Sequence, residues 1–333
     1  MTRDNVILAP SPHIGHIGQD ADVDIPANSL KNLKRWVIRH WLAYDERALR
    51  AFLDRIGVRA SDTLMVHSSW RALNGFQGTP AQFCAALRES VGESGLVVMP
   101  SLTYQNQSSA EFLAIGKPMD VRRSPSAMGL LSEVFRRGKG VVRSLSPTHP
   151  LLAWGHDAAK FIAGHEQTDR PFGPDSPFSR LLERDALILC VDTGFESITF
   201  THYVEDRFAD TLAVPLYEPE PMPGTVIDRE GNRIDCPTRV LSREANRLRR
   251  EARLIDHLQR NRLLLARRLG NTRFTWIRAT DLLAGAEQLV ASGLHFFDAP
   301  VVQSLDSSAT GHERVGQSSH RRRAGVNGPA AQR

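Results

Sequence analysis

The sequence predicts an α/β fold in which a central, largely parallel sheet is flanked by helices. Three short apolar runs, at residues 63–66, 96–99 and 186–191, have the length and composition of buried strands. An amphipathic helix pattern separates the first two runs, and the order strand, helix, strand favours a parallel pair. Beyond about residue 211 the pattern becomes mixed, so we expect a smaller α+β region at 211–301.

The compact part of the chain is predicted at residues 44–301. It begins with a helix at 46–56, which Gly57 ends. After the first strand, Thr79 has the character of an N-cap for the next helix. Gln82, three residues later, completes a capping box. These signals support a helix between the first two strands and therefore a crossover connection.

Two terminal segments are predicted to lie outside this domain. Residues 1–43 form an extension that contains a short basic helix at 29–42. Residues 302–333 are rich in Ser, Gly, Ala and Arg without apolar periodicity, which predicts a disordered basic tail. Within the C-terminal part of the domain, residues 213–217 and 224–232 have the pattern of a β-meander or hairpin, with the turn at 228–232. Residues 243–269 have the pattern of one long arginine-rich helix.

The composition of the chain argues against several classes of protein. The chain has 333 residues, of which 41% are hydrophobic, and a formal net charge of +5. No apolar run approaches the ~20 residues of a transmembrane helix, so we expect no stable membrane anchor. Cys84, Cys190 and Cys236 are too far apart for a zinc pattern or a disulfide framework, so we expect no metal and a reducing cytoplasm. Zinc-finger, RNA-binding and basic-zipper signatures are absent from the sequence, so we expect no nucleic-acid partner.

A candidate catalytic group follows the third strand. Gly194 marks a turn into a helix on which Thr199, His202 and Glu205 fall at three-residue spacing and share one face. An imidazole beside a carboxylate can serve as a general base with its orienting partner. The alternative is a pair on a helix surface that does no chemistry, because motifs this short recur by chance.

Small hydroxyl side chains follow the first two strands. Ser68 and Ser69 come after the first, and Ser101 and Thr103 come after the second. Ligands of an open α/β sheet bind beyond the carboxyl ends of its strands, so these hydroxyls either line one crevice or are ordinary turn residues. His149 lies in a proline-bounded loop, where it is either a site residue or a histidine held by a backbone carbonyl.

Six motifs in a fixed order resemble the aminoglycoside 3-N-acetyltransferase family of antibiotic N-acetyltransferases. The similarity covers roughly residues 44–298. The motifs are Val66-His67-Ser68-Ser69, Met99-Pro100-Ser101-Leu102-Thr103, the helix from Gly129 to Arg136, Arg143-Ser144 with Pro147-Thr148-His149, Phe172-Gly173-Pro174-Asp175-Ser176-Pro177, and Thr199-Phe200-Thr201-His202-Tyr203-Val204-Glu205.

The resemblance implies transfer of an acetyl group from acetyl-CoA, the co-substrate, to an amino group of an aminoglycoside, an amino sugar or a related small amine. His202 would take the proton from the acceptor amine, and Glu205 would orient His202 and stabilise its charge. Thr199 would help to hold the thioester or its tetrahedral intermediate. The pantetheine and diphosphate arm of CoA would contact four hydroxyl side chains: Ser68, Ser69, Ser101 and Thr103.

The same resemblance places the acceptor near Arg143, His149 and Asp175. Two positions depart from the family's pattern, because Ser146 stands where the family has its first histidine of this loop and Pro150 where it has a following serine. Direct transfer requires neither a metal nor an acyl-enzyme. A homodimer is possible.

The charge of the chain bears on the acceptor. A pocket for a polycationic aminoglycoside is expected to be acidic, whereas this chain is basic overall. Only four acidic residues lie close to the motifs: Asp169, Asp175, Glu205 and Asp206. Two alternative functions remain open. One is a thioester or ester hydrolase on the same fold, although the Gly-x-Ser-x-Gly elbow is absent. The other is a catalytically degenerate CoA-binding or scaffold protein.

Overall fold

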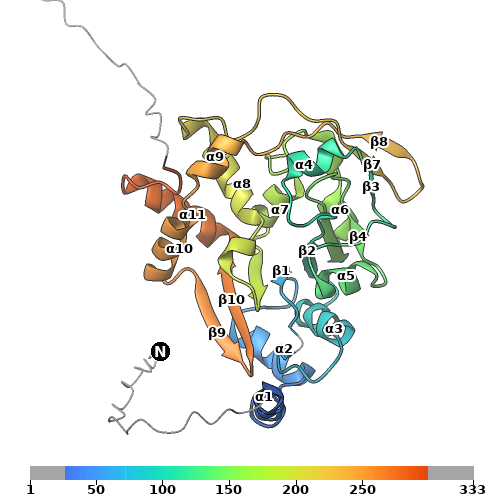
Figure 1. Ribbon diagram of the computed structural model, residues 1–333, viewed down its shortest axis with the longest axis vertical. Helices are drawn as coiled ribbons and strands as arrows, with labels where there is room; N and C mark the ends of the chain where they lie inside the picture. Colours follow the sequence, from blue (N-terminus) through green and yellow to red (C-terminus); the bar gives the residue numbers. More distant parts are fainter. Residues whose placement is uncertain (1–26, 72, 299–333) are drawn as a thin grey trace, which may run out of the picture.

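A computed structural model describes residues 27–71 and 73–298 of the chain (Figure 1). The predicted basic tail at 302–333 and most of the N-terminal extension lie outside the described residues. Within them, no helix combines the length and the apolar character that crossing a membrane requires. The homodimer, the cytoplasmic location and the domain limits at residues 44 and 301 stay predictions.

The centre of the fold is a seven-stranded sheet in the order β4-β5-β2-β1-β6-β10-β9. The three predicted strands are confirmed as β1, β2 and β6, which lie side by side and run parallel. The strands of this sheet are β1 (Thr63–Ser68), β2 (Leu96–Pro100), β4 (Val142–Arg143), β5 (Leu151–Gly155), β6 (Leu187–Val191), β9 (Leu265–Leu269) and β10 (Thr272–Arg278).

The prediction of a largely parallel sheet is wrong outside this centre. β5 is antiparallel to β2 and β4 to β5, and on the other side β10 is antiparallel to β6 and β9 to β10. For β4–β5 and β9–β10 the connections are short, and a short connection allows only antiparallel neighbours, since a parallel pair needs a long crossover. The β9–β10 connection has two residues, of which Gly270 takes a left-handed φ of 55°.

Helices cover both faces of the sheet. They are α1 (Ala27–Trp41), α2 (Glu46–Arg55), α3 (Pro80–Val91), α4 (Ser109–Ala114), α5 (Leu130–Arg136), α6 (Ala158–Ile162), α7 (Pro177–Glu183), α8 (Phe200–Arg207), α9 (Arg243–Leu248), α10 (Glu251–Arg260) and α11 (Ala279–Ala291). The capping box predicted for α3 is confirmed, with Thr79 and Gln82 each accepting from the other's backbone N–H.

Alternate residues of the central strands pack into two separate hydrophobic cores, one on each face of the sheet. Leu64 and Val66 of β1 belong to the core beneath α2, α3 and α5. Met65, between them, belongs to the core beneath α6, α7, α8, α10 and α11. A parallel strand buried on both faces must be apolar throughout, which is why the three parallel runs were recognisable in the sequence.

The long helix predicted at 243–269 is wrong. The chain forms α9 and α10 with a break between them, and the last residues form the edge strand β9. The break has a tertiary cause, because the backbone N–H of Arg250 donates to the carbonyl of Phe296 instead of continuing the helix. β9 is mostly exposed, and even Leu265 is 41% exposed. Its sequence therefore lacks the apolar alternation of a half-buried strand and could be read as the end of an amphipathic helix.

The predicted turn at 228–232 is confirmed, and the hairpin that it closes joins a second, three-stranded sheet. That sheet has the order β3-β7-β8 and consists of β3 (Met119–Asp120), β7 (Thr225–Ile227) and β8 (Arg233–Asp235). Residues 213–217 form no strand, contrary to the prediction, and only Tyr217 makes an isolated bridge, to Leu241. The chain after residue 211 therefore forms no separate region of its own, contrary to the prediction. β7 and β8 pair with β3, while β9 and β10 extend the main sheet because β10 carries an apolar run that pairs with β6.

Candidate active site

The sequence-predicted site residues meet at one edge of the sheet. Parallel strands place their carboxyl ends together, and ligands bind beyond those ends. Ser68 ends β1, Ser101 and Thr103 follow β2, and α8 follows β6 after a short 3₁₀ turn. The three central strands therefore bring together segments that lie more than a hundred residues apart in the sequence.

The predicted pair of His202 and Glu205 is formed on α8. Nδ1 of His202 lies 2.9 Å from Oε2 of Glu205. An ionised carboxylate only accepts hydrogen bonds, so Nδ1 carries the proton and Nε2 keeps its lone pair. Glu205 is 4% exposed, whereas a quarter of the His202 side chain is exposed. A buried carboxylate thus orients an imidazole that a ligand can reach.

A third residue, Arg249, completes this row. It lies between α9 and α10, and its Nε and Nη2 donate to the two carboxylate oxygens of Glu205 at 2.5 and 2.8 Å. Burial alone would raise the pKa of Glu205, but the charges of His202 and Arg249 and their hydrogen bonds hold this pKa below its ordinary value. Sequence reasoning missed Arg249, because within the apparent long helix nothing marked it as a partner of α8.

A cavity of about 1110 Å³ opens beside this row, and we call it the His202 cavity. His149 and His202 both line this cavity. The ring of Phe172 contacts both imidazoles, with its centroid 4.5 Å from that of His149 and 4.9 Å from that of His202. Burial, together with the neighbouring histidines 202 and 165, holds the pKa of His149 well below its ordinary value. His149 is therefore a neutral polar group in the wall of the cavity.

Three of the predicted site hydroxyls are buried without a hydrogen-bond partner among the described residues. They are Oγ of Ser101, Oγ1 of Thr103 and Oγ1 of Thr199. A buried hydroxyl without a partner costs ~1–3 kcal/mol. Thr199 directly precedes α8, yet its side chain makes no capping bond to the helix. None of the three residues is among those that line the His202 cavity, so their hydroxyls lie behind its wall.

Arg143 and Asp175 are not brought to the His202 cavity. Arg143 is 6% exposed, and its guanidinium donates to the carbonyls of Ser124 and Ser101. Burial and the charge of Arg136 lower its pKa to about 9. Asp175 is exposed in the turn before α7 and is not among the residues that line the cavity. Arg143 instead fixes the backbone of the segment that carries Ser101.

A second cavity, of about 610 Å³, lies at the ends of β1 and β6, and we call it the basic cavity. Ser69, Thr193 and Gly194 line it together with two carboxylates, Asp192 and Glu196, and four exposed cationic side chains. Within the described part of the chain, none of these four cations forms an ion pair. The four are Lys34, Arg71, Arg268 and Arg273, from four different segments.

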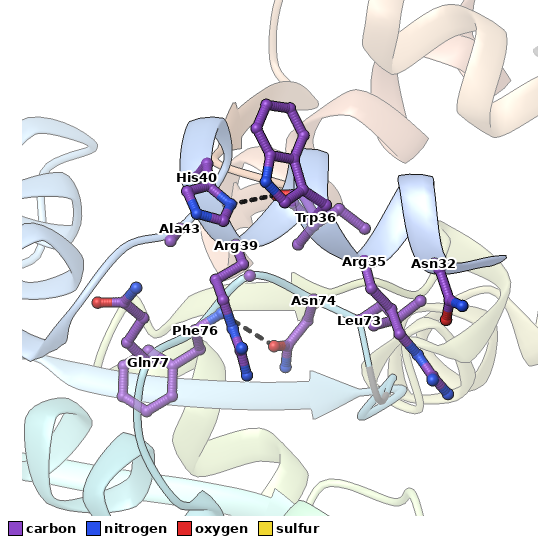
Figure 2. Close-up of a pocket in the computed structure, with 12 residues that line it drawn as sticks. Asn32, Arg35, Trp36, Arg39, His40, Ala43, Leu73, Asn74, Phe76 and Gln77 are labelled. Atoms are coloured by element: carbon purple, nitrogen blue, oxygen red, sulfur yellow. Dashed lines mark hydrogen bonds between the residues drawn. The ribbon is translucent and has the colours of Figure 1, made fainter. Parts of the chain in front are cut away.

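A third cavity, of about 580 Å³, lies beneath α1 (Figure 2). Arg35 and Arg39 extend toward it, while Trp36 stacks on His40 with ring centroids 4.7 Å apart. None of the described residues that line this cavity is a carboxylate, and Nδ1 of His40 hydrogen-bonds to the carbonyl of Trp36 instead. In Figure 1, α1 lies at the opposite end of the molecule from α9. The acid–base chemistry is therefore better placed at His202.

Three comparisons with known proteins show what this chain is similar to. A family model described as aminoglycoside 3-N-acetyltransferase matches residues 65–291. The aminoglycoside N(3)-acetyltransferase VII of Streptomyces paromomycinus is 30% identical over 167 residues, which cover 46% of this chain and 57% of that protein. The structure of AAC-VIa bound to sisomicin has a TM-score of 0.60 and 26% identity, and the match covers 75% of this chain and 98% of that one.

A further structure, AAC-IIIb with CoASH, has a TM-score of 0.60, 20% identity and coverage of 76% of this chain and 98% of that one. At that identity the likeness shows the fold alone. The matches to curated relatives span between 57% and 62% of those proteins' length. The matched residues include every predicted site position from Ser68 to Glu205 as well as Arg249.

Proposed function

We propose that this chain, which belongs to the aminoglycoside 3-N-acetyltransferase family, transfers an acetyl group from acetyl-CoA to the amino group of a small acceptor. The observation that carries the proposal is the row Arg249–Glu205–His202, which ends in an imidazole at the wall of the His202 cavity. A reactive base, an orienting carboxylate and a cavity for an acceptor are thereby combined at the edge where ligands of such sheets bind.

The proton of the acceptor amine goes to His202. Nε2 carries the lone pair, since Nδ1 donates to Glu205. As the amine nitrogen attacks the thioester carbonyl carbon, the N–C bond forms and the C–S bond breaks. The nitrogen's proton passes to Nε2, and the sulfur leaves as a thiolate that takes up a proton. Glu205, held in turn by Arg249, fixes the ring orientation and stabilises the imidazolium as it forms.

The orphaned hydroxyls fit the acetyl donor. Thr199 directly precedes the helix that carries His202, so we assign its Oγ1 to the acyl oxygen, which gains negative charge during attack. Ser101 and Thr103 follow β2, where their unpaired hydroxyls suit the amide groups of the pantetheine arm. Ser68 and Ser69 follow β1 at the same edge of the sheet and extend this lining toward the basic cavity.

The basic cavity suits the phosphates of CoA. Its four cations come from segments that meet only in the folded chain, and no carboxylate within ion-pair distance neutralises them in the described structure. Phosphate groups bind readily to such clusters and to backbone N–H groups at turns. Ser69 and Gly194, which line the cavity, follow the same strands that lead to the catalytic residues.

The test is release of free thiol from acetyl-CoA, measured with and without a panel of amines, together with the mass of the product. We expect thiol release to depend on the amine and to equal the amount of N-acetylated product. Thiol release that is independent of the amine would instead indicate a thioester hydrolase. Failure to bind acetyl-CoA at all would indicate a scaffold protein and would overturn the proposal.

A further inference from the structure

We propose that the acceptor amine carries an anionic group of its own, a carboxylate or a phosphate, and that Arg243 binds this group. The inference rests on the proposed function and concerns the acceptor side of the same site. It follows from how the charges around the His202 cavity are paired. A polycationic acceptor requires unneutralised carboxylates, and the structure provides few of them.

The acidic residues that lie near the sequence motifs are already neutralised by arginines. Oδ1 of Asp206 accepts from Arg170 at 2.6 Å and from the hydroxyl of Tyr217 at 2.8 Å. Asp169 pairs with Arg239 at 2.7 Å. Glu205 pairs with Arg249, as described above, and Asp175 is exposed away from the cavity. Three of these four carboxylates are paired with arginines, and the fourth, Asp175, does not line the cavity.

The residues that line the His202 cavity are balanced in charge. The lining carboxylates are Glu111 and Glu218, and the lining guanidinium groups are Arg243 and Arg249. Glu111 accepts two hydrogen bonds from Ser108 in the capping box of α4, and Glu218 accepts from the backbone N–H of Arg243. Because Arg249 is already paired with Glu205, Arg243 and the two glutamates remain, with one negative charge in excess, which is fewer than the several ammonium groups of a polycation require.

Arg243 is the cation of this cavity that forms no ion pair among the described residues, although its charge, after the hydrogen bonds from Ser108, helps to lower the pKa of Glu111. Arg243, Asn246 and Arg249 recur every three residues and all line the cavity. Arg249 is engaged by Glu205 and by Oδ1 of Asn246 at 2.6 Å. The side chain of Arg243 makes no ion pair and donates no hydrogen bond within the described residues. It is an exposed guanidinium on the same wall as the catalytic row.

This arrangement favours one charge pattern in the acceptor. An amine that loses its proton to His202 presents no net charge at the reacting nitrogen, while a carboxylate or phosphate elsewhere on the molecule would find Arg243. Guanidinium groups bind both anions through paired N–H donors. Additional ammonium groups would meet Arg243 and Arg249 instead, and like charges placed together disfavour the wrong partner.

The experiment compares matched acceptors in the thiol-release assay: glucosamine, glucosamine 6-phosphate, 2-amino-2-deoxyglucuronic acid and the polycation sisomicin. We expect kcat/KM to be at least tenfold higher for the two anionic amines than for glucosamine, and sisomicin to be the poorest. Equal values for glucosamine and both anionic amines, or the highest value for sisomicin, would overturn the inference but leave the proposed transferase intact. Absence of thiol release with all four amines would overturn the proposed function itself.

A charge reversal assigns the effect to one residue. Arg243→Glu should lower kcat/KM for the better anionic amine by roughly 10- to 100-fold, as expected for loss of a charge-assisted contact. The loss for glucosamine should be much smaller. Arg247→Glu is the matched control, because Arg247 lies on the same helix, is 76% exposed and does not line the cavity. Equal losses in the two variants, or equal losses for charged and neutral amines, would contradict the role of Arg243. The comparison of phosphate with carboxylate then identifies which anion the site prefers.

Discussion

The His202 cavity and the basic cavity differ in how their charged side chains are paired. Around the His202 cavity, the buried and half-buried charges are paired within the protein, as in Glu205 with Arg249 and Asp206 with Arg170. Around the basic cavity, four cations stand without ion-pair partners among the described residues. In the first cavity the buried carboxylate is paired before any ligand enters and one exposed cation, Arg243, forms no ion pair among the described residues, whereas the second cavity presents four such cations to a ligand.

This difference has a physical basis in burial. Glu205 and Asp206 lie in the interior, where an unpaired charge is very costly and each carboxylate needs a cation beside it. Lys34, Arg71 and Arg268 are exposed, so water solvates them at little cost until an anion binds. A preset environment suits a group that must hold a proton in one geometry. A solvated cationic rim suits recognition of phosphates.

The largest expected effect is at the base. His202→Ala should lower kcat/KM for the acceptor by ~10²–10⁴-fold, because general-base catalysis contributes that much to amine attack. Binding of acetyl-CoA, measured by calorimetry, should change little, since the phosphates are assigned to the other cavity. His156→Ala is the control, as His156 is a surface histidine whose side chain is 74% exposed. Near-normal turnover in His202→Ala would show that the base has been misassigned.

The paired charges of the His202 cavity are tested through stability. Glu205→Gln keeps the side-chain shape but leaves Arg249 without its carboxylate, and breaking a buried pair costs ~3–5 kcal/mol of unfolding free energy. Urea denaturation at neutral pH measures this cost. Glu244→Gln is the control, because Glu244 is 57% exposed and forms only a 3.9 Å surface pair, for which we expect at most ~1 kcal/mol. Equal losses of unfolding free energy in the two variants would contradict the role of the buried Glu205–Arg249 pair in stability.

The loss of stability in Glu205→Gln should depend on pH. The pKa of Glu205 is lowered in the folded protein, so its contribution to stability is complete above the ordinary value of 4.5 and is lost as the pH falls through the folded value. The difference in Tm between the wild type and Glu205→Gln should therefore be largest at neutral pH and shrink below about pH 4.5. A difference that grows toward acid pH would show that the carboxylate is not held in its ionised form.

Removing the Thr199 hydroxyl, which we assign to the acyl oxygen, should lower the activity but raise the stability of the protein. Thr199→Val should lower kcat by ~10²-fold if its Oγ1 donates to the developing oxyanion. It should also raise the unfolding free energy by ~1 kcal/mol, because a buried hydroxyl without a partner is removed. Thr275→Val is the control, since Thr275 also carries an orphaned Oγ1 but lies on β10 and not at the start of the helix that carries His202. A normal kcat in Thr199→Val would remove the residue from the mechanism.

Local signals explain what the sequence predicted correctly. The parallel strands are continuous apolar runs because both of their faces are buried, and the capping box of α3 lies within four residues. The pairing of His202 with Glu205 follows from one turn of helix geometry and needed no knowledge of the rest of the fold. Positions at strand ends likewise identified Ser101 and Thr103 before their unpaired hydroxyls were known.

Non-local contacts explain what the sequence did not predict. Arg249 reaches Glu205 from 44 residues away, and the break before α10 depends on a hydrogen bond to the carbonyl of Phe296. The edge strand β9 is exposed on both faces, so its composition carried no strand pattern, and only pairing with β10 defines it. The cations of the basic cavity come from segments as far apart as Lys34 and Arg273, and no periodicity in a single segment could connect them.

The smallest expected effect is at the basic cavity, where charges are exposed and shared among four residues. Arg268→Ala should raise KM for acetyl-CoA by roughly tenfold, the equivalent of ~1.4 kcal/mol, and leave kcat nearly unchanged, because uniform loss of binding affects KM alone. Added salt should raise the wild-type KM more steeply than that of the variant, since screening removes the contact that the variant already lacks. Arg267→Ala is the matched control, because Arg267 is an exposed neighbour on β9 that does not line the cavity. If the two variants gave the same KM, the unpaired cations would have no role in binding phosphates, and the contrast between the two cavities would reflect solvation alone.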